Sequence, residues 1–188
     1  MTRPDVLHLS NDPEANRLIA RDPAALLIGF LLDQQITVQK AFEGPLRLLE
    51  RAGTIEPAAL AAMPLDELTD HVRARPAIHR FPGNMAKRVQ QAMQLVVDRY
   101  DGDVDRIWLE ATDTADVRQR LEEIPGLGAH TALTFTTVLA RRFGLPFAGF
   151  EDELPPYGCL GDVDSPEALE AYQAAKRAHK AALRAAKA

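Results

Sequence analysis

The sequence predicts an all-α fold. Helix-capping signals recur along the chain, apolar residues repeat at helical spacing between them, and alternating strand patterns are nearly absent. With 188 residues, of which 46% are hydrophobic, the chain is long enough to fill one substantial core or two small ones. We therefore expect a globular helical protein.

The first predicted helix opens at Asp22-Pro23, where an N-cap residue precedes proline at the first helical position. Its apolar positions indicate burial, and it ends near Gln34. Thr37 is placed to cap the next helix, over 38–52, and Gly53 is placed to end it. Short helices are then expected from about Pro57 and Pro64.

The second half of the predicted fold begins with a long helix over 83–100, ended by Asp101-Gly102. Thr112-Asp113 caps a further helix that Pro125 ends, and another helix runs over 130–143. Residues 145–163 are expected to be irregular. An alanine-rich basic helix then begins at Ser165-Pro166-Glu167 and reaches almost to the end of the chain.

The turn Pro125-Gly126-Leu127-Gly128 is the most informative stretch. Gly126 and Gly128 tolerate backbone conformations that other residues avoid, so amide N–H groups there and at the start of the next helix are free to point outward together. Such a turn suits a phosphate. The alternative is an ordinary connection between two helices.

The full string, an aliphatic residue followed by Pro-Gly-Leu-Gly-x-x-Thr-Ala, resembles the helix-hairpin-helix of the base-excision DNA glycosylase superfamily, which includes endonuclease III and the 3-methyladenine DNA glycosylases. The segment from Leu31 to Val38 is similar to the family's leucine-serine-glutamine-glutamine-threonine bend. Ile78 to Val89 and the turn at Tyr100 resemble two further family segments, in the family order. The resemblance covers residues 22–146.

This resemblance implies a two-lobed fold. A six-helix barrel-like lobe would comprise 22–143, with the helix-hairpin-helix at about 113–143. A second helical lobe would combine 1–21 with 144–188. Double-stranded DNA would lie across the cleft between them.

The resemblance also implies which residues face DNA. At the bend, Gln35 would act as a polar wedge when a nucleotide leaves the stack, with Gln34 beside it; the alternative for both is helix capping. The residues expected at the DNA are Gln34, Gln35, Lys87, Pro125, Gly126, Leu127, Gly128, His130 and Thr131.

The family chemistry uses an aspartate soon after the second hairpin helix, and the family motif is absent here. Counting from Gly144 places Glu151 at the expected position, with Asp152 next to it. A carboxylate there would stabilise an oxocarbenium-like sugar and activate water. Three successive acids in an irregular segment are also typical of a solvated loop.

His130 stands where strand-cleaving family members carry a lysine. Imidazole forms no stable imine with a sugar aldehyde, so we expect no lyase activity by that route. His130 would instead contact a phosphate or carry a proton. A partly exposed polar residue without a role is the alternative.

No cofactor is expected apart from an ion. The resemblance implies a monovalent cation held by backbone carbonyl groups of Ile124, Gly126 and Gly128. Cys159 is the sole cysteine, so one chain cannot build an iron-sulfur cluster or an intramolecular disulfide. The histidines have no spacing typical of a metal site.

The net charge of −5 opposes a DNA-binding function at first sight. However, basic residues cluster around Arg88, at Arg141-Arg142 and along the last helix, so a local basic face is compatible with it. The apolar runs are too short to span a membrane and no signal peptide is visible, which favours a cytoplasmic location. The sequence does not indicate an oligomeric state.

Three functions therefore remain open. The first is a monofunctional DNA glycosylase that flips a damaged base, the second is a catalytically inactive protein that binds lesions or DNA structures, and the third is a helical interaction module without DNA contact. The damaged base is not indicated.

Overall fold

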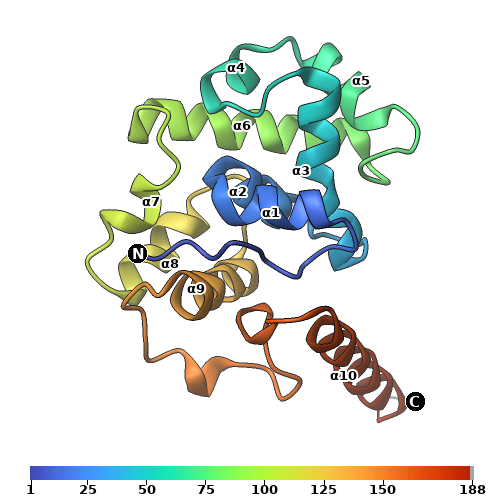
Figure 1. The fold of residues 1–188 in the computed structure, drawn as a ribbon, viewed down its shortest axis with the longest axis vertical. Helices are drawn as coiled ribbons and strands as arrows, with labels where there is room; N and C mark the ends of the chain where they lie inside the picture. The colour runs from blue at the N-terminus through green and yellow to red at the C-terminus, as the bar shows by residue number, and fades with distance from the viewer. Residues whose placement is uncertain (187–188) are drawn as a thin grey trace.

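The computed structural model describes residues 1–186 (Figure 1), so 187–188, the end of the predicted second lobe, lie outside it. Within the described part the chain forms α-helices and two short 3₁₀-helices and contains no β-strand. The prediction of an all-α fold is confirmed.

The α-helices are α1 (Pro13–Arg21), α2 (Pro23–Leu32), α3 (Val38–Ala52), α4 (Pro57–Ala62), α5 (Leu65–Arg73), α6 (Pro82–Tyr100), α7 (Arg106–Leu109), α8 (Thr114–Glu122), α9 (Ala129–Phe143) and α10 (Pro166–Ala185). The 3₁₀-helices are η1 (Glu151–Glu153) and η2 (Leu160–Asp162), in the segment predicted to be irregular.

The capping signals set the helix starts where the sequence predicts them. The Asp22 carboxylate accepts a hydrogen bond from the Ala25 amide at 3.0 Å. Asp113 caps α8 and Ser165 caps α10 in the same manner, at 2.9 Å and 3.1 Å. Gly53 ends α3 with φ of 73°, in the left-handed region that favours glycine.

Sequence reasoning missed α1 and α7. The start of α1 carries the same aspartate-proline signal as α2, since Asp12 accepts hydrogen bonds from the amides of Glu14 and Ala15 at 2.7 and 3.2 Å. No side chain caps the start of the short α7, so the sequence carries no start signal for it. It forms because Ile107 and Trp108 are buried there.

The core contains a chain of aromatic rings that joins four helices. Phe30 of α2 stacks on Phe135 of α9 with ring centroids 4.1 Å apart, and it meets Phe42 of α3 edge-on at 5.1 Å. Trp108 of α7 packs against Phe135 at 5.6 Å. Aromatic pairs of this kind add to the stabilisation that comes from burial, so α2, α3, α7 and α9 are held as one packed unit.

The terminal segments are tied to this unit at specific points. The Thr2 amide donates to the Phe143 carbonyl at 3.0 Å, and Arg3 forms an ion pair with Asp105. At the other end, the side-chain amides of Gln39 in α3 and Gln173 in α10 exchange hydrogen bonds of 3.0 and 2.6 Å. The division into two lobes stays a prediction.

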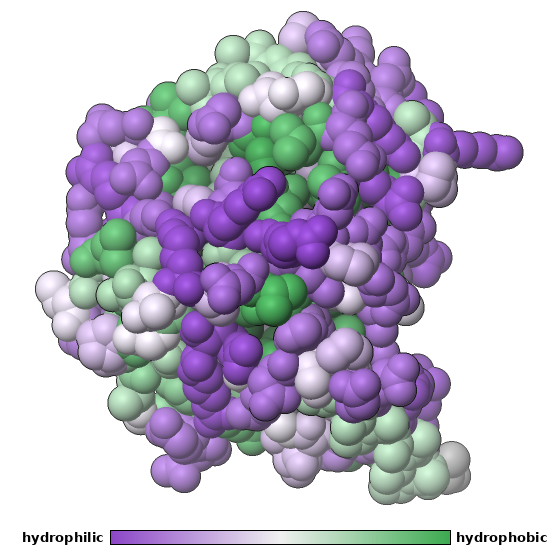
Figure 2. All heavy atoms as spheres, viewed as in Figure 1, coloured by the Kyte–Doolittle hydropathy of each residue, from purple (hydrophilic) through white to green (hydrophobic). Residues whose placement is uncertain are grey.

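Helix α10 extends away from the other helices toward the C-terminus (Figure 1), and residues 181–186 are exposed. Figure 2 shows a mostly hydrophilic face, with a pale green region at the outer end of α10, where alanine predominates. Residues Leu169 and Tyr172 are buried, so α10 is fixed through its first half. No helix in residues 1–186 is long and apolar enough to cross a membrane.

The aromatic chain supports a stability prediction. Replacing Phe135 with alanine should lower the free energy of unfolding by about 3–5 kcal/mol, because the substitution leaves a cavity beside Phe30 and Trp108. Urea unfolding followed by circular dichroism measures this change. The matched control is Leu109→Ala, at a side chain 51% exposed, which should cost less than about 0.5 kcal/mol. Equal costs for the two variants would contradict the role of the aromatic chain.

Candidate nucleic-acid interface and adjoining pocket

The hairpin turn, residues 124–128, connects α8 to α9. The Leu127 amide donates to the Ile124 carbonyl at 3.0 Å, which closes the turn. Gly126 has φ of 100°, a conformation that other residues rarely adopt, and a Cβ atom there would lie 3.1 Å from Cδ of Arg88. Gly128 has φ of −97°, so its conformation does not require glycine.

The first turn of α9 offers unpaired donors. Among the described residues, no side chain caps this helix, and a Cβ atom at Gly128 would meet nothing within 4 Å. Gly128, Ala129 and His130 are exposed. Because the first N–H groups of a helix lack intrahelical partners and carry partial positive charge, this end of α9 can bind an anion.

The side chain of Gln34 braces the hairpin turn. Its Nε2 atom donates to the carbonyl groups of Leu31 and Gly126, at 3.0 Å each, and its Oε1 atom accepts from Arg88 of α6. These contacts join the bend after α2, the hairpin turn and α6. The amide of Gln34 is therefore engaged within the protein, as in the capping alternative, while its expected contact with DNA stays a prediction.

His79 connects the same bend to Phe81 through hydrogen bonds of its ring. The Phe81 amide donates to Nδ1 of His79 at 3.1 Å, so the ring proton is on Nε2, which donates to the Gln34 carbonyl at 2.8 Å. Burial lowers the pKa of His79, and the charges of Lys40, Arg80 and Arg88 lower it further. The hydrogen bond to the Gln34 carbonyl opposes this by raising the pKa. The neutral ring that this bonding requires is therefore favoured at neutral pH.

Gln35 has an unusual backbone for its residue type. Its φ of 58° lies in the left-handed region, where a side chain costs about 1–2 kcal/mol. The neighbouring bonds of Gln34 hold it there. Its exposed side chain lines two pockets, one with Asp33 and His130 and the other with Phe81 and Arg88. Gln35 therefore lies between the two pockets, while its role as a wedge stays a prediction.

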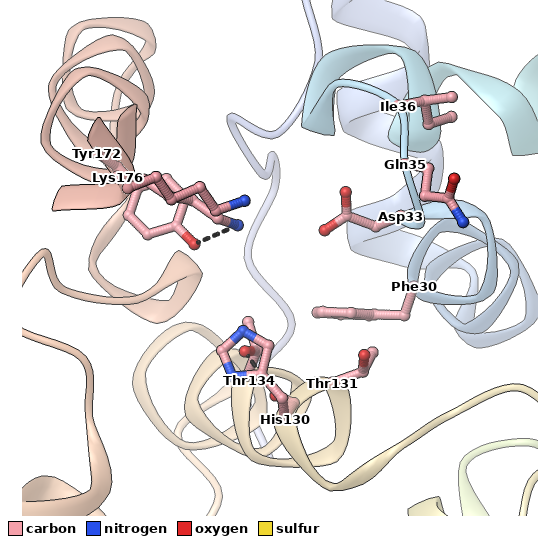
Figure 3. Close-up of a pocket in the computed structure, with 10 residues that line it drawn as sticks. Phe30, Asp33, Gln35, Ile36, His130, Thr131, Thr134, Tyr172 and Lys176 are labelled. Carbon is pink, nitrogen blue, oxygen red and sulfur yellow. Dashed lines mark hydrogen bonds between the residues drawn. The ribbon is translucent and has the colours of Figure 1, made fainter. Parts of the chain in front are cut away.

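The first of these pockets, here called the Asp33 pocket, has a volume of about 210 Å³ and lies between α2, α9 and α10 (Figure 3). Its size is below the roughly 300–1,000 Å³ of sites for drug-sized ligands, so it suits a single sugar or base. The lining residues are Phe30, Asp33, Gln35, Ile36, His130, Thr131, Thr134, Tyr172, Lys176 and Lys180.

The ionisable groups of the Asp33 pocket influence one another. Burial raises the pKa of Asp33, although Lys176 and Lys180 oppose this. Burial lowers the pKa of Lys176, and the nearby charge of Lys180 adds to the effect while Asp33 opposes it. Burial and the two lysines also lower the pKa of His130. Clusters with such perturbed pKa values are typical of functional sites.

The two predicted catalytic carboxylates lie elsewhere. Glu151 and Asp152 are exposed in η1, and neither lines the Asp33 pocket. The adjoining Glu153 pairs with Arg118 of α8 at 2.6 Å, and Thr114 is bonded to both backbone groups of Ala148. These contacts attach the segment to α8. The catalytic assignment of Glu151 or Asp152 stays a prediction.

The structure brings His130 and Thr131 into one pocket with Gln35. Lys87 is exposed on α6, while Pro125 and Leu127 shape the hairpin turn. Sequence reasoning missed Asp33 and Lys176 as members of the site. Asp33 directly precedes the glutamine pair, which was a usable signal, whereas Lys176 reaches the pocket only through the packing of α10.

The carbonyl groups proposed for a monovalent cation each already accept a hydrogen bond. Ile124 accepts from the Leu127 amide, Gly128 from the Ala132 amide at 2.9 Å, and Gly126 from Gln34. Each carbonyl oxygen has a second lone pair, so these three oxygens can still coordinate a weakly held cation. Among the described residues, no cluster of three or more histidine, cysteine or acidic side chains could hold a metal ion.

Comparison with known proteins gives one structural match. No family model and no curated protein matches the chain. A solved structure of a trapped covalent intermediate between endonuclease III and DNA, an estranged-adenine complex, matches with a TM-score of 0.50 and 28% sequence identity. The match covers 67% of this chain and 50% of that one, so the chain spans about half of the endonuclease III chain.

The resemblance to the helix-hairpin-helix DNA glycosylases is confirmed. The chain shares the fold of a DNA-repair glycosylase, with 28% sequence identity over the matched part. Histidine replaces the family lysine of the hairpin, and the loop after α9 lacks the family motif.

Two neighbouring glutamines should respond to mutation in opposite ways. Gln34→Ala removes the partner of Arg88 and of two carbonyl groups, so it should lower the free energy of unfolding by about 1–3 kcal/mol. Gln35→Gly relieves the left-handed strain but adds unfolded-chain entropy, so the net change should lie between zero and a gain of about 1 kcal/mol. Chemical denaturation measures both. A clear loss of stability in Gln35→Gly would contradict backbone strain at Gln35.

Proposed function

We propose that this protein is a DNA-binding base-excision repair protein, and specifically a DNA glycosylase that extrudes a damaged nucleotide into the Asp33 pocket. The observation that supports this most strongly is the juxtaposition of the uncapped start of α9, the strained Gln35 and a pocket of nucleotide-component size. The endonuclease III neighbour was captured on DNA.

In this proposal the hairpin turn grips one backbone phosphate. The exposed amides at Gly128, Ala129 and His130 supply donors, and the partial charge at the start of α9 attracts the anion. Contacts of this kind to the DNA backbone do not depend on the base sequence of the DNA. It needs only a local positive potential, which explains how a chain of net charge −5 would bind DNA.

Gln35 would fill the gap that the extruded nucleotide leaves. The residue is exposed, and its strained backbone is fixed by the bonds of Gln34 beside it. On the side of Gln35 away from the Asp33 pocket, Phe81 is 40% exposed and carries Arg80 over its ring at 4.8 Å. Phe81 is therefore available to stack against the opposite strand.

A carboxylate must stabilise the cationic sugar while the bond from C1′ to the base breaks and the base leaves with the electron pair. We propose Asp33 for this role because it lines the pocket. As water attacks C1′, the carboxylate takes its proton. Glu151 and Asp152 remain the alternative from chain position, since η1 carries three exposed acids that DNA docking could approach.

DNA binding is tested at Gly128, where an aspartate would fit the backbone. Gly128→Asp places a carboxylate where the phosphate is proposed, so the Kd for duplex DNA at 0.1 M salt should rise tenfold or more. The unfolding free energy should be unchanged or slightly raised, because aspartate caps a helix well. Fluorescence anisotropy across a salt series measures the binding.

The matched control for this variant is Ser165→Asp. It adds the same charge and keeps a capping residue at the start of α10, away from the Asp33 pocket, so the Kd should change less than twofold. Equal weakening in the two variants would show a general charge effect instead of a phosphate site. Absence of salt-sensitive duplex binding by the wild type would support the interaction module.

Catalysis is tested by base release from a panel of duplexes carrying alkylated, deaminated or oxidised bases. We expect release from at least one, with a loss of about 100-fold or more in Asp33→Asn and a much smaller loss in Glu151→Gln and Asp152→Asn. A larger loss of base release in Glu151→Gln or Asp152→Asn than in Asp33→Asn would assign the catalytic carboxylate to η1. Salt-sensitive binding without any base release would favour the catalytically inactive lesion binder.

A further inference from the structure

The Asp33 pocket contains a primary amine that the proposed hydrolysis does not use. Lys176 comes from α10, and Figure 3 shows its ammonium group extending into the space opposite Asp33, with His130 on a third side. The described residues include no ion pair between Lys176 and Asp33. The amine is therefore free of a carboxylate partner and faces the cavity.

Two contacts position this amine. Tyr172, one helical turn earlier, is buried, and its hydroxyl accepts a hydrogen bond from Nζ of Lys176 at 3.3 Å. The ammonium group also lies 5.4 Å from the centre of the Tyr172 ring. The paired amides of Gln39 and Gln173 fasten the same turn of α10 to α3. Lys176 thus projects from a fixed part of α10.

The surroundings of Lys176 suit a reactive amine better than a phosphate clamp. A phosphate bound at Lys176 would face the carboxylate of Asp33 across a small cavity, which is unfavourable between like charges. A neutral sugar aldehyde meets no such repulsion. Burial lowers the pKa of Lys176 and so raises the fraction of the nucleophilic neutral amine.

We propose that Lys176 forms a Schiff base with the aldehyde of an abasic deoxyribose extruded into the Asp33 pocket. The inference rests on the proposed function, because the hairpin turn must deliver the sugar. It gives the protein a covalent activity that the histidine at position 130 had argued against. The amine would come from α10 in place of α9, on the other side of the same cavity.

The reaction balances with groups that the pocket holds. The neutral amine of Lys176 adds to C1′ of the ring-opened sugar, and the carbinolamine loses one water to give the imine. The protonated imine acidifies the hydrogen on C2′. When a base, for which Asp33 is placed, takes that proton, the electron pair forms the C2′–C3′ double bond and the 3′ phosphate leaves. Water then hydrolyses the imine and restores the amine.

The test uses the full chain and a duplex that already contains an abasic site, so no base release is required. Sodium borohydride reduces an imine to a stable secondary amine, and a protein–DNA adduct then appears on a denaturing gel. We expect an adduct for the wild type, a loss of tenfold or more in Lys176→Ala and Lys176→Arg, and peptide mass spectrometry that places the adduct on Lys176.

Arg177→Ala is the matched control, because it removes one exposed positive charge from the same helix and should leave the adduct yield within twofold. Duplex affinity is measured for every variant, so a lost adduct is distinguished from lost binding. Lys176→Arg is the sharper variant, since it keeps the charge and removes the reactive amine.

Each outcome decides between the two proposals. Salt-sensitive duplex binding without an adduct, or an adduct that maps to another lysine or to the N-terminus, overturns the inference and leaves the proposed function intact. An adduct at Lys176 without base release from any damaged duplex supports the inference and contradicts the glycosylase. Absence of duplex binding overturns both.

Discussion

The side-chain amide of Gln34 is the interaction on which the site depends. It connects three segments that are distant in sequence, because it bonds to the end of α2, to the Gly126 carbonyl and to Arg88 of α6. Buried or partly buried polar groups are costly when unpaired, so this arrangement has one satisfied geometry. That geometry fixes the hairpin turn against α2, and the next residue, Gln35, has a left-handed backbone.

Phe30 belongs both to the packed core and to the site. Phe30 stacks on Phe135 inside the aromatic chain and also lines the Asp33 pocket. The floor of the pocket is therefore part of the packed interior, while two of its walls are helix ends and the third is α10. A rigid floor with charged walls suits a site that must hold one sugar in one orientation.

The sequence predicted the helices with strong start signals, except α1, and the character of the hairpin turn, because capping and glycine preferences act locally. It did not predict α7, whose burial depends on contacts with distant helices. For the site, it predicted that Gln35 and His130 each face DNA, which stays a prediction, and the structure places both in the lining of one pocket. Lys176 was out of reach, since only the packing of α10, through Gln173 and Tyr172, carries it to Asp33.

The central claim is that the hairpin turn and the Asp33 pocket hold successive parts of one DNA strand. The most direct measurement is a crystal structure with a duplex carrying a tetrahydrofuran analogue of an abasic site. We expect a backbone phosphate on the amides at the start of α9, Gln35 inside the base stack of the duplex, and the analogue between Asp33 and Lys176. A duplex bound on another face, or an analogue still stacked in the helix with the pocket vacant, would contradict it.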